Sequence, residues 1–454
     1  MSVEAVVDAS LLQRLLQSSE SVFVKKLSNN DRDWAVFANK HQSGIYVPRS
    51  ERDGGFFPSL AVKSRADPEA GEIWESEFPI SWPQVGEADK KTRLVNYRQK
   101  GEETHLTRLP KQAFSMLSPG SYLIIGRETV EAKTRYGALT IDSNSDDALF
   151  LEDALSLPVD FQAVVRVPER QRDQIRDQLL DFAELAIAAW KRGELAAFAA
   201  RNAEMPDTAT LAEMARQQYL ADHNLRELNP FELSAPGDVV RKISREIELE
   251  IFRRFQLQSG AVALVRLIAG DQSAGISAAT IVRRLIERVR DVDALMLSAS
   301  QQRRSRAGYS FEHHIEAMLT AGRVPFQKQV IIEAKKRPDF ILPSLKHLRG
   351  LYPGDAAGLI LSAKTTLRER WKQVQREKGA QELFLATVDE KIASNAIEDM
   401  ADLGIKLVVP ESLKSRDTNA GKGTEYGRHE NVLSFSTFFR DVLRDQRMPL
   451  WRSI

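Results

Sequence analysis

Two acidic residues and one lysine in the second half of the chain have the spacing of a hydrolytic metal site. Asp339 follows Pro338 at the start of a predicted strand, Lys364 ends a later strand, and Glu377 lies thirteen residues beyond Lys364 in a predicted helix. Carboxylate oxygens are the ligands that Mg²⁺ prefers, and a bound Mg²⁺ polarises a phosphate and lowers the pKa of a bound water. Because a lysine can orient or deprotonate that water, the set predicts metal-dependent hydrolysis of a phosphodiester.

The second acid departs from the spacing that is usual in nucleases. That spacing puts the acid two residues before the lysine, where this chain has Ser362, so Glu377 is expected to supply it from the helix. Gln373 lies four residues before Glu377, on the same helix face. Glu312, on the helix before the first strand, is a further candidate acid. Each residue taken alone is more commonly a solvated surface group, so the prediction depends on the whole set.

A charged triplet follows the lysine closely. Arg368, Glu369 and Arg370 stand at the start of a predicted helix. Arginine can pair in a bidentate manner with guanine O6 and N7, and glutamate accepts a hydrogen bond from cytosine N4. The triplet therefore predicts reading of a G·C-rich half-site beside the scissile phosphate. The alternative is that the triplet forms a salt-bridged, solvent-exposed helix face. If the triplet is considered in isolation, this alternative is preferred.

The elements that must position these residues form an α/β second half. Helices are expected over 239–297 and after Gly308, where Phe311, Ile315, Met318 and Leu319 share one face. Helices alternating with short apolar strands predict a sheet covered on both faces. The strands are expected at Val330–Ile332, Phe340–Leu342, Ala357–Ala363, Glu382–Ala386 and Ile405–Val409, with a helix from about Arg368 to Lys378.

The first half of the chain has a different pattern of apolar and turn-forming residues. Short β-rich runs separated by Gly, Pro, Asn and Asp predict a mainly-β barrel or sandwich. Turn-rich segments near residues 205 and 229–237 place a domain boundary near 204, which gives domains 1–203 and 204–454. The β-rich runs are Val22–Lys26, Gly44–Val47, Tyr122–Ile125 and Phe161–Val167, and a helix with Leu179, Phe182, Leu185, Ala186 and Trp190 on one face follows them.

Composition narrows the classes of protein further. The 454 residues carry a formal net charge of +1, so a case for nucleic-acid binding must depend on local patches. The absence of cysteine excludes disulfides, thiolate metal sites and a cysteine nucleophile. No P-loop motif, signal sequence or membrane-length apolar run is present, and we expect a cytoplasmic protein without a membrane partner.

At the candidate catalytic residues the chain resembles the EcoRII family of type II restriction endonucleases. The resemblance implies a restriction-endonuclease-like domain of the PD-(D/E)XK variant type that uses Mg²⁺ as cofactor. It implies that Asp339, Lys364 and Glu377 are catalytic and that Glu312 is an accessory acid. Asp339 and Glu377 would be the metal ligands. It also implies that the triplet reads the ends of a CCWGG or CCNGG site that is cut before the first C. The matching stretches are Arg303 to Gly308 with Ser310-Phe311-Glu312, Lys336 to Phe340, Lys364 to Glu377, and Leu407 to Pro410.

The first half resembles the B3-like effector domain of the same family, a pseudobarrel that binds a second copy of the DNA site. His41 and Tyr46 match its DNA-contacting positions, and Glu103 and His105 fall where further contacts lie. The dense basic run of the family is reduced here to Glu102-Glu103-Thr104-His105. Without the surrounding match, His41 would be interpreted as a hydrogen-bonded loop histidine.

Family members also flip the central base pair out of the helix into a pocket, which costs a few kcal/mol of unstacking. Arg245 aligns with a pocket arginine, whereas the companion aromatic position is Leu249. Leucine cannot stack on a base as an aromatic ring does, so core packing is the alternative role for Leu249.

The overall expectation is a homodimeric endonuclease that binds two or more copies of a double-stranded DNA site. A two-fold dimer suits a palindromic site. We further expect the effector domain to cover the catalytic cleft until it binds a second copy of the DNA site. The resemblance also implies a companion methyltransferase that is not a stable partner. The alternatives are a sequence-specific DNA-binding regulator with an inactive nuclease core, and a repair or structure-specific nuclease.

Overall fold

The protein's structure is a computed structural model that describes residues 10–36, 44–63, 72–97, 103–143, 145–158, 161–270, 277–288, 310–331, 337–349, 358–365, 367, 381–390, 392–414 and 425–452. The chain divides into two compact units, Met1–Asp177 and Gln178–Ile454. The division falls inside one long helix, α5 (Pro168–Lys191). The domain boundary near residue 204 stays a prediction.

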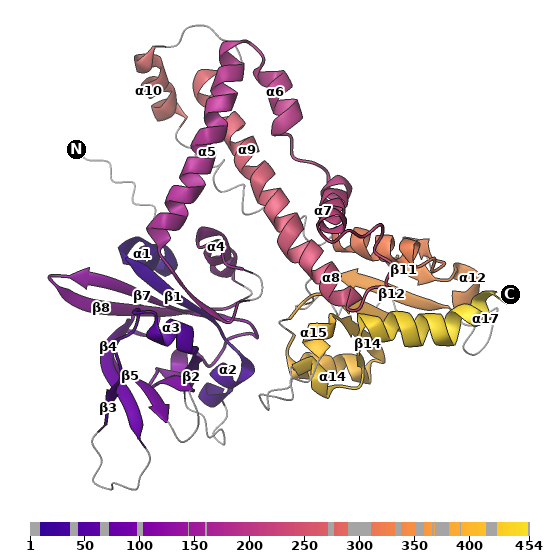
Figure 1. The fold of residues 1–454 in the computed structure, drawn as a ribbon, viewed down its shortest axis with the longest axis horizontal. Coiled ribbons are helices and arrows are strands. Elements are labelled where there is room, and N and C mark those ends of the chain that lie inside the picture. Colours follow the sequence, from indigo (N-terminus) through magenta and orange to yellow (C-terminus); the bar gives the residue numbers. More distant parts are fainter. Residues whose placement is uncertain are drawn as a thin grey trace. The chain divides into compact units, whose positions relative to one another are not determined.

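A β-sheet forms the framework of the first unit (Figure 1). Its strands are β1 (Ser21–Lys26), β2 (Gly44–Val47), β3 (Ala61–Val62), β4 (Ile73–Trp82), β5 (Glu87–Tyr97), β6 (Thr104–Thr107), β7 (Tyr122–Val130), β8 (Lys133–Ile141) and β9 (Ala163–Arg166). Neighbours follow the order β2-β6-β5-β4-β8-β7-β1-β9, with β3 beside β4. The pairs are antiparallel except β4 with β8, which meet in parallel at Ser81 and Gly137.

Alternation along β1 shows why this sheet folds around two cores. Val22 and Val24 pack with the helices on one face, whereas Phe23 packs with Ile125 and Trp82 on the other. Successive side chains of a strand point to opposite faces, so one strand serves both cores. A mainly-β first half is therefore confirmed for the residues that the structure describes. The helices of this unit are α1 (Leu11–Ser18), α2 (Asn29–Val36), α3 (Arg49–Asp53) and α4 (Asp146–Ala154).

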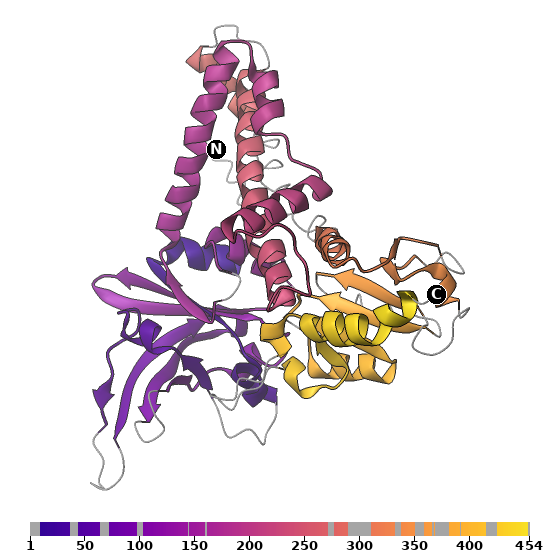
Figure 2. The same cartoon turned by 45° about the vertical axis from the view of Figure 1, so that its right-hand side comes forward.

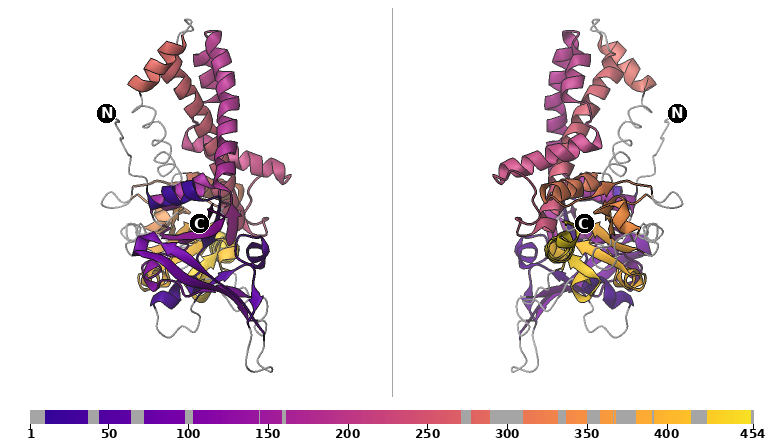
Figure 3. Two further views of the ribbon diagram at one scale, coloured as in Figure 1. Left: turned by 90° about the vertical axis from the view of Figure 1, so that its left-hand side faces the viewer. Right: turned by 90° about the vertical axis from the view of Figure 1, so that its right-hand side faces the viewer.

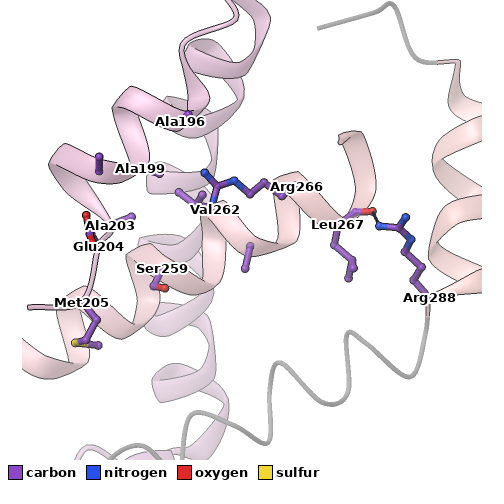
Figure 4. A pocket seen from close by; sticks show the side chains of 12 residues that line it. Ala196, Ala199, Ala203, Glu204, Met205, Ser259, Val262, Arg266, Leu267 and Arg288 are labelled. Carbon is purple, nitrogen blue, oxygen red and sulfur yellow. Dashed lines mark hydrogen bonds between the residues drawn. The ribbon is translucent and has the colours of Figure 1, made fainter. Parts of the chain in front are cut away.

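A helical segment opens the second unit. Helices α6 (Leu195–Asn202) and α9 (Glu248–Ala269) lie side by side (Figure 1 and Figure 3), and their alanines and valines share a small core. Between them lies a cavity of about 660 Å³, lined mainly by small apolar side chains together with Arg266 and Arg288 (Figure 4). None of its lining residues is a predicted site residue. The remaining helices here are α7 (Thr208–Asp222), α8 (Pro236–Lys242), the π-helical turn Ile243–Ile247 and α10 (Ala278–Glu287).

A mixed sheet completes the second unit. Its strands are β10 (Gln327–Lys328), β11 (Phe340–Leu342), β12 (Leu359–Lys364), β13 (Glu382–Thr387), β14 (Ile405–Val409) and β15 (Val432–Ser434). They neighbour one another in chain order. The pairs β10–β11 and β11–β12 are antiparallel, and the pairs from β12 to β15 are parallel. The strand expected at Val330–Ile332 does not form at Val330 and Ile331, and Ile332 lies outside the described residues. Gln327 and Lys328 pair with β11 slightly earlier in the chain.

Helices cover both faces of this sheet, as the sequence predicts. On one face, Phe340 and Leu361 pack against Phe311 and Phe438. On the other, the intervening strand residues pack against α12 (Leu345–Leu348) and α14 (Ser394–Asp402). Figure 2 shows the yellow C-terminal helical segment lying against the strands. That segment comprises α16 (Phe435–Thr437), the π-helix Phe438–Arg447 and α17 (Met448–Arg452), and α15 (Glu411–Lys414) precedes it.

The helix expected after Gly308 runs over residues 310–321, and all four predicted core residues on it are buried. The helix expected from Arg368 to Lys378 lies outside the described residues. In the part of the chain that the structure describes, we find no helix with both the length and the apolar character needed to cross a membrane.

Candidate active site

Sheet topology brings Asp339 and Lys364 to one edge. Strand β11 runs antiparallel to β12, with Phe340 opposite Leu361 and Leu342 opposite Leu359. The start of β11 and the end of β12 therefore lie at the same edge of the sheet, although 24 residues separate Asp339 from Ala363. The apolar strands that the sequence predicts around these two residues are what place them together.

The side chains of Asp339 and Lys364 contact each other directly. Lys364 Nζ lies 2.7 Å from Asp339 Oδ2, and the backbone N–H of Ala363 donates to the same oxygen over 2.8 Å. Only 8% of Asp339 is exposed, so two donors compensate the desolvation of a buried carboxylate. The lysine side chain is 24% exposed.

Glu312 supplies a second acid from the helix over residues 310–321. Its Oε1 atom lies 3.7 Å from Lys364 Nζ, and the residue is 8% exposed. Burial, followed by the negative charge of Asp339, raises the pKa of Glu312 to about 7, while the charges of Lys364 and Lys328 oppose the rise. Two carboxylates thus share one lysine, and one of them changes charge near neutral pH.

A buried histidine fixes the helix that carries Glu312. His314 is fully buried, its Nε2 atom lies 2.9 Å from Glu248 Oε2, and Arg216 Nη1 lies 3.4 Å from its Nδ1 atom. Burial lowers the pKa of His314, while the Glu248 carboxylate opposes that shift. Because an arginine can only donate, Nδ1 accepts and Nε2 carries the proton that is donated to Glu248. Sequence reasoning did not single out this contact, which joins α7, α9 and the helix with Glu312.

The acids present here suit a hard divalent cation. Asp339 and Glu312 offer carboxylate oxygens beside each other, and oxygen donors are what Mg²⁺ prefers. Within the described part of the chain, no cluster of three or more potential metal ligands forms. Glu377, the predicted metal-binding partner of Asp339, lies outside the described residues, as do Arg368, Glu369 and Arg370.

Residues 275–438 match the family model described as "EcoRII C terminal". Those residues are similar to the EcoRII C-terminal family. The match confirms the predicted resemblance for this segment, and Asp339, Lys364 and Glu312 all lie within it.

Two curated relatives match over similar lengths. The type II restriction enzyme EcoRII of Escherichia coli is 34% identical over 139 residues, which are 30% of this chain and 34% of the relative. The type II restriction enzyme SsoII of Shigella sonnei is 28% identical over 172 residues, which are 35% of this chain and 52% of the relative. The chain therefore spans about a third and about half of the lengths of these two relatives.

Solved structures also resemble the chain. Metal-depleted Ecl18kI in complex with uncleaved DNA is 23% identical, covers 61% of this chain and 85% of its own, and has a TM-score of 0.41. The UbaLAI restriction endonuclease B3 domain with cognate DNA is 19% identical, covers 34% of this chain and 93% of its own, and has a TM-score of 0.25.

Arg245 precedes the matched segment 275–438 by 30 residues but contacts a loop within that segment. Arg245 Nη1 donates to the carbonyl oxygen of Val388 over 3.3 Å and lies 3.8 Å from Glu390 Oε1. Arg241 forms a closer ion pair with Glu390, at 2.9 Å. Leu249 is half-buried. The role of Arg245 in a flipped-base pocket stays a prediction.

The predicted effector residues lie in the first unit, also outside the EcoRII C-terminal segment. Tyr46 on β2 and His105 on β6 are cross-strand partners with ring centroids 6.1 Å apart. Glu103, the residue before β6, is exposed, and His41 lies outside the described residues. The structure thus brings Tyr46 and His105 together.

A buried ion pair supports this aromatic pair. Lys25 and Asp31 are both almost fully buried, with Nζ 3.5 Å from Oδ2. The other carboxylate oxygen of Asp31 accepts the backbone N–H of Tyr46 over 3.1 Å, and Lys25 Nζ lies 5.5 Å from the centre of the Tyr46 ring. Sequence analysis did not assign a role to Lys25 or Asp31. The available signal was a lysine directly after the apolar run Val22–Val24.

Proposed function

We propose that this protein is a type II restriction endonuclease that makes Mg²⁺-dependent double-strand cuts at a CCWGG- or CCNGG-like site. The observation that carries the proposal is the contact between Lys364 and the buried Asp339 at one sheet edge, with Glu312 beside them. The family match over residues 275–438 and the names of the two curated relatives support the same activity.

In this proposal the catalytic domain is a PD-(D/E)XK variant. Asp339 and Glu377 would hold the cation, which when bound polarises the phosphate and lowers the pKa of a water. Lys364 orients that water and stabilises negative charge on the phosphate. Asp339 holds the lysine in place through its 2.7 Å contact, and Glu312 supplies an accessory carboxylate within the same buried cluster.

Recognition would use two separate parts of the chain. Arg368, Glu369 and Arg370 read the outer G·C pairs of the site, and Arg245 contributes to a pocket for the central base. In the first unit, the B3-like domain binds a second copy of the site through His41, Tyr46, Glu103 and His105, and thereby regulates cleavage. The protein acts in the cytoplasm as a homodimer, in which each subunit cuts one strand.

Digestion of a plasmid of known sequence, with and without Mg²⁺, tests the proposal. Discrete bands whose sequenced ends share one short palindrome, and which appear only with a divalent cation, are the expected result. Random nicking would favour a repair nuclease. Specific binding without any cleavage would favour a DNA-binding regulator with an inactive nuclease core.

Regulation by the first unit has its own experiment. A plasmid with one copy of the site is digested by the full chain, and a short duplex with the same site is then added. We expect the added duplex to accelerate cleavage of the plasmid. No acceleration at any duplex concentration would contradict a regulatory effector site.

A further inference from the structure

Glu312 and His314 lie two residues apart on the helix over residues 310–321. Successive residues of an α-helix are rotated by about 100°, so side chains two residues apart point to nearly opposite sides. Glu312 Oε1 lies 3.7 Å from Lys364 Nζ. His314 Nε2 lies 2.9 Å from Glu248 Oε2 on α9. The contact of His314 on one side of the helix therefore helps to set the rotation that places the Glu312 carboxylate on the other.

Apolar packing alone does not set this rotation. Phe311, Ile315 and Met318 are fully buried in the core that the helix shares with the sheet. Hydrophobic burial is non-directional, whereas a hydrogen bond weakens steeply as its angle departs from linear. The hydrogen bond between His314 and Glu248 thus supplies a direction that the apolar contacts lack.

Both ring nitrogens of His314 have a partner on a neighbouring helix. Glu248 on α9 faces Nε2, and Arg216 Nη1 on α7 lies 3.4 Å from Nδ1. Arg216 Nη2 in turn donates to Glu213 Oε2 on α7. His314 is fully buried, and Glu248 is 5% exposed. A buried polar network whose members are hydrogen-bonded rigidifies the elements that it joins, here α7, α9 and the helix of Glu312.

The backbone that carries Glu248 is irregular at the same place. A π-helical turn, Ile243–Ile247, stands between α8 and α9, and Glu248 is the first residue after it. Single π-helical turns within helices are frequently found at functional sites. Such a turn also shifts the side on which the following residues lie, so it contributes to the orientation of Glu248 toward His314.

We propose that His314, through its bond to Glu248, is a positioning residue that holds Glu312 in place in the active site. The inference deepens the proposed function and rests on it, because the position of Glu312 matters only if the site cleaves DNA. A misplacement of about 1 Å can lower a reaction rate by about 10²-fold. Because His314 is fully buried, it does not contact DNA itself, and its loss should slow cleavage without weakening DNA binding.

The experiment measures single-turnover cleavage of a cognate duplex by the full-length protein and, with Ca²⁺ in place of Mg²⁺, the Kd of that duplex. His314→Phe removes both ring nitrogens and should lower the cleavage rate by at least about tenfold, with Kd unchanged within about twofold. His314→Gln keeps a donor that reaches Glu248 and should restore most of the rate. His313→Gln, which alters the neighbouring and less buried histidine, is the matched control and should leave both quantities unchanged.

A double variant separates positioning from a merely structural role. If His314 acts through Glu312, His314→Phe should change the cleavage rate by less than about twofold in a Glu312→Gln background. Its effect on the melting temperature should be similar in both backgrounds. An equal loss of rate in both backgrounds would overturn the inference. A rate for His314→Phe within about twofold of that of the unaltered protein would overturn it as well.

A second pair of variants decides if His314→Phe does not fold or if Glu312→Gln shows no measurable cleavage. Asparagine is one methylene shorter than glutamine and is too short to reach Glu248. His314→Asn should therefore cleave at least about tenfold more slowly than His314→Gln, at equal folded fraction. Equal rates for the two variants would overturn the inference. Cleavage by the unaltered protein is measured first, so a failure of the proposed function is seen separately from the behaviour of the variants.

Discussion

The ammonium group of Lys364 and the carboxylate of Asp339 are hydrogen-bonded over 2.7 Å, and the peptide N–H that precedes the lysine donates to the same carboxylate oxygen. The aspartate is therefore oriented by the strand that carries the lysine. This geometry holds the lysine and the aspartate in a fixed relation to each other.

Lys364→Ala should lower the cleavage rate by roughly 10²- to 10⁴-fold, the usual contribution of a group that moves or orients a proton. Specific binding should stay largely intact, because the triplet that we expect to read the bases is unchanged. Cleavage is followed on a labelled duplex, and binding by fluorescence anisotropy with Ca²⁺ in place of Mg²⁺. Lys346→Ala removes an exposed lysine on α12 and is the control. Loss of cleavage and binding together would indicate that Lys364 is structural.

Glu312→Gln should change how stability depends on pH in the presence of a chelator. The pKa of Glu312 is raised from 4.5 to about 7, so between these values the folded protein holds a proton that the unfolded chain releases. The stability of the unaltered protein should therefore fall, relative to the variant, as pH rises from 4.5 to 7. We expect the melting temperature of Glu312→Gln to exceed that of the unaltered protein by more at pH 8 than at pH 5.

Two further measurements sharpen this prediction. Mg²⁺ should reduce the difference in melting temperature between Glu312→Gln and the unaltered protein at pH 8, because a bound cation favours the ionised carboxylate. Glu398→Gln, on the exposed side of α14, is the matched control. A difference in melting temperature between Glu312→Gln and the unaltered protein that does not change with pH would contradict the raised pKa of Glu312.

Arg370→Ala should reduce discrimination at one base pair by about 1–3 kcal/mol. Arg370→Lys should lose most of that discrimination too, because lysine keeps the charge but lacks the planar fork. Competition binding against duplexes altered at each position in turn measures the effect. A uniform loss of affinity for every duplex would instead identify Arg370 as a phosphate contact.

Asp31→Ala should destabilise the first unit by about 3–5 kcal/mol, since it removes the carboxylate that faces the buried ammonium group of Lys25. The same change removes the acceptor of the Tyr46 backbone N–H, so the binding of duplex DNA by the first unit should weaken. Thermal unfolding and DNA binding of the full chain measure the two effects. Asp53→Ala, an acid on α3 that is largely exposed, should leave both nearly unchanged. Normal stability in Asp31→Ala would exclude a supporting role for the ion pair.

Much of the fold could be predicted from hydrophobic patterning. Strand β14 begins and ends at Ile405 and Val409 as predicted, because a strand buried on both faces is a nearly continuous apolar run. Strands β4 and β5 were not predicted. A strand with one solvent-exposed face alternates apolar and polar residues, but β4 contains the continuous polar run Glu75-Ser76-Glu77 and β5 begins with a largely polar run, Glu87 to Arg93.

The candidate site could also be predicted only in part from the sequence. Residue types and their order were enough to select Asp339, Lys364 and Glu312, which the structure brings together. His314 was not selected, because its significance lies in a partner 66 residues away. A lone histidine in a sequence does not indicate which buried carboxylate it will face.

The antiparallel pairing of β11 with β12 also has a practical use. Because the two strands run in opposite directions, the connection that starts after Leu342 leaves from the edge of the sheet remote from Asp339 and Lys364. A fluorescent dye can therefore be attached on this connection, at Lys346→Cys, without crowding the reacting edge. The native chain contains no cysteine, so the introduced thiol would be the single attachment point, and single-molecule imaging of the protein on DNA needs no prior removal of other thiols.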